Sequence, residues 1–463
     1  MTAVPRILQR AEHPISRGYI DKDALHVLYR LHKAGFKGFL VGGSVRDLMT
    51  GRTPKDFDVG TDARPEQIRR VFRNSRIIGR RFRLAHVYFD GGKYVEVSTF
   101  RGRPEAVDAE QRIEGDADLL IRSDNTFGTP EEDAVRRDFT INGLFYDIAT
   151  FNVLDYVGGV DDLAARVVRT IGEPEIRFRE DPVRMLRACE FAARLDFELE
   201  PKLVDALAEV GTELRKSAAP RVTEELLDPL RRGWGRATYA LWSQTGLLAV
   251  VFPELDREVG GVGDSAPPHA PVFWRMLEEA DQRKAQGASL PDAALLGLLF
   301  LPLVLAAVKR GAGEGKKVDP ARILVLLDEV VNLPALRLAL PNQNVHLLKQ
   351  GLYTLGRLAE TRPGDAAARR LVARPYFPVA VAILAIYAKA SGRYRDAAAA
   401  WEEVLDRGGG HGSSPADFTR TTPFPEALVP LPALADPRAS TGPRRRRRRG
   451  RAPGSVPAAA RID

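Results

Sequence analysis

Two aspartates lie one residue apart in the stretch PKDFDVG, at Asp56 and Asp58. Alternate residues of a β-strand point to the same side, so a strand here would bring both carboxylates onto one face. Two such carboxylates repel each other unless a cation lies between them. Because Mg²⁺ is usually held by carboxylates together with phosphate oxygens, the pair predicts a magnesium site, although a solvated loop would also accommodate it.

A glycine-rich stretch, LVGGSVRD, precedes this pair and carries Gly42, Gly43 and Arg46. Glycines let a ligand approach the backbone closely, and amide groups at the start of a helix favour phosphate. The guanidinium of Arg46 adds a planar fork that matches phosphate oxygens. The spacing fits neither the dinucleotide-binding fingerprint nor the P-loop, and a Gly-Gly pair by itself indicates only a turn. Beside Asp56 and Asp58, however, the stretch predicts that phosphate-binding amides face the two carboxylates.

Two further acids are candidates for a third carboxylate in such a site. Glu96 alternates with Tyr94 and Ser98 on an expected strand, whereas Asp138 follows Arg137 in the stretch RRDFTINGL. Arg137 and Asp138 could together bind a phosphate and a ribose hydroxyl. They could equally form a surface ion pair, which contributes little to stability. The residue types alone leave the choice between Glu96 and Asp138 open.

The stretch REDPVRMLRACEFAARL predicts a helix over residues 179–195, with Pro182 in its first turn. Arg184 and Arg187 are three residues apart and would project side by side from this helix. Asp181 next to Arg184 offers an acceptor and donors that could recognise the edge of a base. The same spacing also suits ion pairs on an ordinary helix surface.

The elements that must position these residues form a small α/β region with a mixed sheet. Gly35 and Gly51 are expected to end two helices, and Pro65 to begin a third. Two alternating segments around DGGK predict a β-hairpin. The expected helices cover residues 23–35, 44–51 and 64–74, and the expected strands cover residues 36–43, 56–61, 84–89 and 94–100.

Beyond Gly159 the strand signals almost vanish, and the pattern is helical as far as Leu405. The apolar run Ala293–Val308 is interrupted by Pro302 and falls short of the roughly 20 residues that a membrane span needs. We therefore expect a buried helix there and no membrane association. The 463 residues suggest about three domains, and a single cysteine, Cys189, is typical of a reducing cytosol.

The net charge of +8 comes almost entirely from the C-terminal segment. Residues 436–463 contain nine arginines and two aspartates, a net of +7, so the preceding 435 residues sum to about +1. The run GPRRRRRRGR stands among Pro, Ala, Gly and Ser, a composition that predicts disorder. Such a tail could bind a polyanion, most simply RNA, or could only increase solubility.

Taken together, LVGGSVRD, KDFDV, RRDFTINGL and EDPVRMLRA resemble, in order and spacing, the motifs of the class II nucleotidyltransferase superfamily. This superfamily contains bacterial poly(A) polymerases and CCA-adding tRNA nucleotidyltransferases. The resemblance covers roughly residues 12–260. It implies an α/β nucleotidyltransferase head with a mixed sheet, followed by an all-α neck, body and C-terminal helical region and a disordered basic tail. The implied boundaries are 15–158 for the head, 159–260 for the neck with its RNA- and nucleotide-binding region, 261–410 for the body and C-terminal helical domain, and 411–463 for the tail.

The resemblance also implies roles for individual residues. Asp56 and Asp58 would hold Mg²⁺ and promote attack by an RNA 3′-hydroxyl on the α-phosphate of ATP. Asp138 would be the third catalytic acid, with Glu96 as its rival. The residues expected to bind substrate are Gly42, Gly43 and Arg46 around the triphosphate, Arg137 at the nucleotide, and Asp181, Arg184 and Arg187 at the base.

The segment IIGRRFRLAHVYF, with Arg80, Arg81 and Arg83, resembles a signature of the bacterial poly(A) polymerase group. It favours a template-independent polymerase that adds AMP from ATP to the 3′ ends of mRNA or small RNA and releases pyrophosphate. The alternative is a tRNA nucleotidyltransferase that adds CCA or only the final A. A helical RNA-binding protein with an inactive head is disfavoured by the intact acids. We further expect a cytoplasmic location, with RNA-decay proteins as partners.

Overall fold

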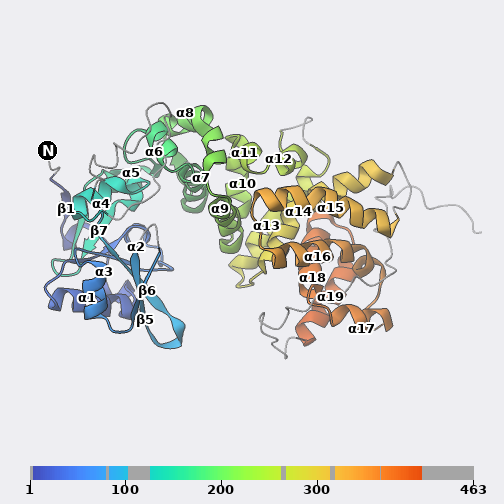
Figure 1. Cartoon of the computed structure of the whole chain (residues 1–463), viewed down its shortest axis with the longest axis horizontal. Helices are drawn as coiled ribbons and strands as arrows, with labels where there is room; N and C mark the ends of the chain where they lie inside the picture. The colour runs from blue at the N-terminus through green and yellow to red at the C-terminus, as the bar shows by residue number, and fades with distance from the viewer. Residues whose placement is uncertain are drawn as a thin grey trace, which may run out of the picture.

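A computed structural model describes residues 4–79, 83–102, 126–261, 267–312, 319–364 and 366–408. Figure 1 shows an α/β head at the N-terminal end of the chain and an elongated array of helices after it. The predicted fold class is confirmed in the described part of the chain. The predictions made for Arg80, Arg81 and the arginine-rich tail lie outside the described residues.

The head is built on a mixed sheet of eight strands in the order β1-β8-β7-β2-β3-β6-β5-β4. Strands β3 and β6 pair in parallel, and every other neighbouring pair in this sheet is antiparallel. The bounds are β1 (Arg6–Leu8), β2 (Gly38–Val41), β3 (Asp58–Thr61), β4 (Ser75–Ile78), β5 (Leu84–Tyr88), β6 (Tyr94–Thr99), β7 (Leu144–Asp147) and β8 (Asn152–Asp155).

The two faces of this sheet are covered differently. Helices α1 (Lys22–Lys33) and α3 (Pro65–Val71) pack on one face, where buried side chains of all the central strands form the main core. On the other face a small aromatic cluster joins β2 and β7 to Ala134 of helix α4 (Pro130–Arg136). This cluster consists of Phe39, Val41, Phe100, Ala134 and Phe145.

Helices make up most of the chain after the head, interrupted by one short parallel pair, β9 (Val167–Val168) and β10 (Glu198–Leu199). They are α5 (Gly159–Ala165), α6 (Pro174–Glu180), α7 (Arg184–Leu195), α8 (Pro201–Val210), α9 (Ala219–Arg232), α10 (Gly235–Gln244), α11 (Leu247–Val251), α12 (Pro253–Val259), α13 (Ala270–Ala285), α14 (Asp292–Ala312), α15 (Pro320–Arg337), α16 (Asn342–Glu360), α17 (Ala366–Val372), α18 (Phe377–Ser391) and α19 (Arg395–Gly408). The head also contains helix α2 (Gly43–Met49) and the short 3₁₀ helix η5 (Thr140–Asn142).

The buried helix expected over the apolar run 293–308 is confirmed as α14, which continues through Pro302. A proline inside a helix removes one hydrogen bond and costs about 3 kcal/mol. The apolar side chains that α14 buries on both sides of Pro302 offset that cost. Within the described residues this is the one helix long and apolar enough to cross a membrane, but 78% of that window is buried, as in a core helix.

Two predicted boundaries also shift. The strand expected over residues 56–61 begins only at Asp58, so Asp56 lies in the preceding loop. The helix expected over residues 179–195 is two helices, since α6 ends at Glu180 and α7 begins at Arg184. Pro182 explains the break, because proline disfavours helical geometry in the residue before it.

Candidate active site

The Asp58 carboxylate lies on the partly open face of the sheet, at the point where β3 begins. Register places Asp58 opposite Val41 of β2, and the neighbouring strand β6 carries Glu96 on the same face. Within the described residues, neither Asp56 nor Asp58 has a hydrogen bond or an ion pair for its carboxylate. Burial and the nearby charges of Glu96 and Asp56 raise the pKa of Asp58 to about 6, and the positive charge of Arg137 opposes them only in part.

A tight turn brings the backbone of Gly42 against Arg137. Gly42 has φ of 68°, and a Cβ at this position would lie 2.8 Å from Nη1 of Arg137. The backbone conformation favours glycine, and a Cβ here would displace the Arg137 guanidinium. The guanidinium of Arg137 donates to Asp133 Oδ2, from Nη2 at 2.9 Å and from Nε at 3.2 Å, and lies over the ring of Phe145. These contacts hold Arg137 between the Gly42 turn and Asp58.

The guanidinium of Arg46 is buried among protein groups rather than exposed to solvent. Its side chain is 2% exposed, and it donates from Nε to Asp47 Oδ1 at 2.8 Å and from Nη1 to Asn142 Oδ1 at 2.5 Å. Its guanidinium also lies over the ring of Phe191 in α7. Arg46 therefore joins α2 to the residues around Asp138 and to the first helices after the head.

Asp138 lies in a second polar cluster, away from the Asp56–Asp58 pair. Its carboxylate accepts from Arg187 Nη2 at 2.8 Å, from Asn142 Nδ2 at 2.9 Å and from the backbone N–H of Phe139 at 2.8 Å. Burial alone would raise the pKa of Asp138, but the charge of Arg187 and these hydrogen bonds lower it to about 2. Both carboxylate oxygens of Asp138 therefore accept hydrogen bonds from protein groups.

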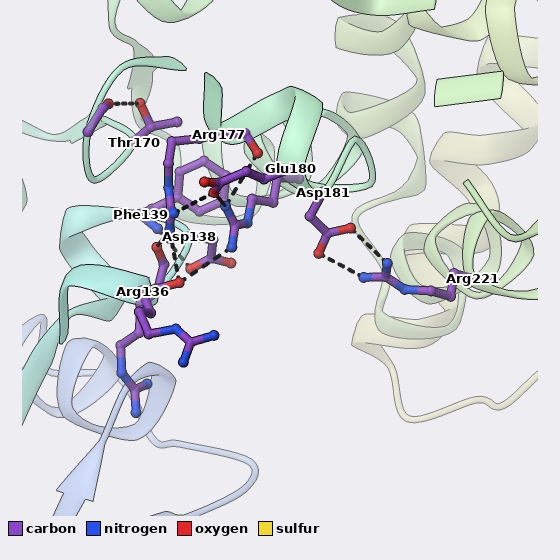
Figure 2. A network of polar contacts seen from close by, with 11 residues as sticks. Arg136, Asp138, Phe139, Thr170, Arg177, Glu180, Asp181 and Arg221 are labelled. Atoms are coloured by element: carbon purple, nitrogen blue, oxygen red, sulfur yellow. Dashed lines mark hydrogen bonds and ion pairs between the residues drawn. The ribbon is translucent and has the colours of Figure 1, made fainter. Parts of the chain in front are cut away.

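The turn between α6 and α7 carries Asp181, and Figure 2 shows its contact with Arg221. Asp181 does not pair with Arg184. Instead it accepts two hydrogen bonds from Arg221 of α9, at 2.7 and 3.0 Å. Arg184 is buried and donates to the backbone carbonyl groups of Arg177 at 3.3 Å and Arg136 at 3.4 Å.

The helical region approaches both clusters. Arg187 reaches from α7 to Asp138, and its Nη1 lies 3.8 Å from Glu225 Oε1 in α9. Burial opposes the charged form of Arg232 at the end of α9, but its pKa is raised by Asp228 and, among weaker influences, by Asp56. The site therefore lies between the head and helices α7 and α9.

Sequence reasoning missed three residues that organise this site. Asp133 orients Arg137, Arg221 holds Asp181, and Glu225 faces Arg187. Asp133 stands four residues before Arg137, a spacing typical of helix ion pairs and therefore a usable signal. Arg221 and Glu225 come from α9, whose sequence carries no motif that points to Asp181 or Arg187.

Comparisons with known proteins agree with this geometry. Residues 38–169 match the family described as "Poly A polymerase head domain", and residues 196–259 match "Probable RNA and SrmB- binding site of polymerase A". The poly(A) polymerase I of Escherichia coli O6:H1 is 42% identical over 386 residues, which are 83% of this chain and 82% of that protein. The chain belongs to the poly(A) polymerase I family.

Poly(A) polymerase relatives and CCA-adding relatives differ in how far the similarity extends. The CCA-adding enzyme of Bacillus subtilis is 39% identical over 238 residues, which cover 51% of this chain. The crystal structure of the Bacillus stearothermophilus CCA-adding enzyme in complex with CTP shares the fold, with a TM-score of 0.55 at 24% identity over 85% of this chain and 82% of that one. The similarity to poly(A) polymerases, unlike that to the Bacillus subtilis enzyme, continues through most of the helical region.

Family membership confirms the predicted activity. The chain is a polynucleotide adenylyltransferase that adds AMP from ATP to RNA 3′ ends and releases pyrophosphate. RNA and a nucleotide are its substrates, and enzymes of this family generally use a divalent metal with ATP.

Proposed function

We propose that Asp56 and Asp58 form the metal-binding centre of this adenylyltransferase, with Mg²⁺ as the ion. The observation that carries this proposal is the state of Asp58, a partly buried carboxylate near other acids and without a protein partner among the described residues. A divalent cation would relieve this repulsion. When bound, it would lower the pKa of the RNA 3′-hydroxyl and neutralise charge that develops on the phosphates.

The donors present suit Mg²⁺, which prefers oxygen ligands and is commonly held by one or two carboxylates together with substrate phosphates. Within the described residues, no group of three or more His, Cys, Asp or Glu side chains is arranged to hold a metal. An open site with two carboxylates therefore leaves the remaining positions to ATP and water. This agrees with a metal that is recruited together with the nucleotide.

We propose Glu96, rather than Asp138, as the third acid near this centre. Glu96 acts electrostatically on Asp58, and its side chain is 43% exposed on the same face of the sheet. Asp138 is occupied by Arg187, Asn142 and the Phe139 amide. Its role in this proposal is to hold Arg187 in place beneath the nucleotide.

The nucleotide is proposed to lie between the Gly42 turn and α7. Gly42 and Gly43 allow the triphosphate to approach the backbone, and Arg137 supplies positive charge beside Asp58. Arg46 is too deeply buried to contact ATP and is proposed to position α2 through Asp47 and Asn142. The carboxylate cluster then faces the α-phosphate, where the O–P bond to the RNA forms and the bond to pyrophosphate breaks.

Base recognition is proposed for the turn that begins α7. Asp181, fixed by Arg221, presents acceptor atoms, and Arg187, whose side chain is 37% exposed, presents donors from α7. Arg184 is buried and is proposed to brace the turn through the carbonyl groups of Arg177 and Arg136. This arrangement would select adenine by the pattern of donors and acceptors on its edge. A cytoplasmic location and association with RNA-decay proteins remain parts of the proposal that follow from the enzyme class.

Incorporation assays test the proposal directly. Purified protein is incubated with Mg²⁺, labelled ATP or CTP, and either a generic RNA or a tRNA that lacks its 3′ end. We expect long tails made from ATP alone on the generic RNA. Incorporation of CTP, or a stop after one to three nucleotides on the tRNA, would contradict poly(A) synthesis. Full activity of Asp58→Asn would contradict the metal centre independently.

A further inference from the structure

Three aromatic side chains lie together on the open face of the sheet, on the strands next to Asp58 and Glu96. The rings of His86 and Tyr94 stack with their centroids 4.0 Å apart and their planes 14° from parallel. Tyr88 lies against both, with centroid distances of 6.1 and 6.0 Å. Strand register explains the grouping, because His86 is opposite Glu96 and Tyr88 is opposite Tyr94 on antiparallel strands β5 and β6.

No hydrophobic core covers this group. The aromatic cluster on this face of the sheet reaches only Phe100 after β6, whereas Tyr94 is 47% exposed and the His86 side chain, which stacks against it, is 12% exposed. The exposed ring of Tyr94 is not needed to stabilise the sheet, whose opposite face already buries Ala85, Val87 and Val95. In Figure 1 the β5–β6 hairpin lies on the side of the head that is turned toward the helical region.

The aromatic group is continuous with the acidic cluster. His86 Nε2 lies 3.1 Å from Glu96 Oε1, and Glu96 in turn acts on Asp58. Tyr94 is two residues before Glu96, which is roughly 7 Å along the strand. A nucleotide whose 3′-hydroxyl reaches the acids is therefore within one nucleotide's length of the rings.

The edge strand adds positive charge at the far end of the same row. Arg76 of β4 is opposite His86, is exposed, and lies with its guanidinium 5.6 Å from the ring centroid of Tyr88. It forms no ion pair with any described residue. Its charge is therefore available to a phosphate group. From β3 to β4 this face of the sheet carries the acids Asp58 and Glu96, then the aromatic rings, then Arg76.

We propose that Tyr94, supported from behind by His86 and flanked by Tyr88, forms a stacking platform for the unpaired bases at the 3′ end of the RNA, with Arg76 binding the backbone. Single-stranded RNA is commonly bound by aromatic rings that stack on its bases, a mode that tolerates any sequence. A polymerase that adds its first AMP to RNA 3′ ends of differing sequence needs such tolerance at the primer end. The platform rests on the proposed function, since it places the RNA relative to the acids.

Substitutions at Tyr94 distinguish the contribution of ring stacking to RNA binding from that of apolar bulk. Tyr94→Leu removes the aromatic ring but keeps apolar bulk, and Tyr94→Phe keeps the ring. Tyr19→Leu is the control, because Tyr19 is 68% exposed on the same domain, in the 3₁₀ turn before α1, the helix that packs on the opposite face of the sheet. We expect Tyr94→Leu to raise KM for an oligo(A) primer about tenfold. KM for ATP, the melting temperature and both comparison variants should stay near the wild-type values.

A binding measurement without catalysis gives a second readout. An oligo(A) RNA with 2-aminopurine as its penultimate base is titrated with protein in the absence of ATP. Stacking on the platform should quench its fluorescence in the wild type, Tyr94→Phe and Tyr19→Leu, and much less in Tyr94→Leu. Equal quenching and equal primer KM in Tyr94→Leu would overturn the platform. If the wild type added no AMP to RNA, the proposed function would fail instead.

Discussion

Two carboxylates of the head, Asp58 and Asp138, have opposite electrostatic surroundings. Asp58 is near Glu96 and Asp56, and its pKa is raised to about 6. Asp138 is also largely removed from water, yet the charge of Arg187 and the hydrogen bonds from Asn142 and Arg187 lower its pKa to about 2. Burial alone therefore does not decide which acid is available for chemistry.

The difference lies in which element supplies the counter-charge. Asp138 receives it from α7, so this carboxylate joins the head to the helical region. Asp58 receives only a partial counter-charge from Arg137, which is itself shared with Asp133. A carboxylate without a close cationic partner in the protein is suited to binding an external cation. A carboxylate whose oxygens already accept hydrogen bonds from an arginine of another domain is suited to holding the two domains together.

The contrast between Asp58 and Asp138 would be refuted most clearly if Asp58 were unimportant for catalysis. We expect Asp56→Ala and Asp58→Asn each to reduce AMP incorporation by roughly a thousandfold, because several kcal/mol of transition-state stabilisation are lost. Asp58→Asn should keep or raise the melting temperature, since it removes a repelled charge. Asp90→Asn, at an exposed turn of the β5–β6 hairpin, is the control and should behave as wild type.

Asp138→Asn should act mainly on stability. It leaves Arg187 without its closest counter-charge, at a cost of about 2–3 kcal/mol, below the range for fully buried pairs because Arg187 is 37% exposed. Urea denaturation measures this loss, and Glu96→Gln provides the contrast with little change expected. If Glu96→Gln destabilised the protein more than Asp138→Asn, Glu96 would be the acid with the structural role, and the roles proposed for these two acids would be wrong.

The two acids should also give opposite responses to pH. The pKa of Asp58 is raised from 3.8, so the folded state binds the extra proton and loses stability as pH increases from about 4 to about 6. The pKa of Asp138 is lowered, so its contribution is present above pH 4 and disappears as pH falls toward 2. Thermal unfolding of wild type, Asp58→Asn and Asp138→Asn across this range measures each contribution.

Metal binding should follow the same titration of Asp58. Below pH 6 the affinity for Mn²⁺, used as a spectroscopic substitute for Mg²⁺, should fall by up to about tenfold per pH unit, because protons compete for the carboxylate. Electron paramagnetic resonance of free Mn²⁺ reports this without any turnover. An affinity that stayed constant from pH 7 to pH 5 would exclude Asp58 as a ligand.

The smallest expected effect concerns the Asp181–Arg221 pair. Arg221→Lys keeps the charge but loses the planar fork that makes two hydrogen bonds to Asp181. We expect KM for ATP to rise about three- to tenfold with little change in KM for RNA. An unchanged KM for ATP, together with retained discrimination against CTP, would show that Asp181 does not need this brace.

Local patterns in the sequence predicted the class of the head and four of its eight strands, but not β1, β4, β7 and β8. The Gly42 turn, the helix that starts with Pro65 and the β5–β6 hairpin all appear where turn residues and alternation predicted them. The four motifs also identified the family, because glycines, acids and arginines in register depend on chemistry rather than on distant packing. Boundaries were harder to predict. The break before Pro182 is a local effect of proline on Asp181, whereas the continuation of α14 through Pro302 depends on the apolar side chains that this helix buries.

The sequence by itself determined which residues could take part in nucleotidyl transfer, and Asp56 and Asp58 needed no structure to be singled out. Only the tertiary structure decided the partners of the others. Asp138 and Arg187 are 49 residues apart, and Asp181 and Arg221 are 40 apart. Counter-charges that come from distant elements leave no local periodicity in the chain, yet they decide whether a carboxylate binds a cation or an arginine.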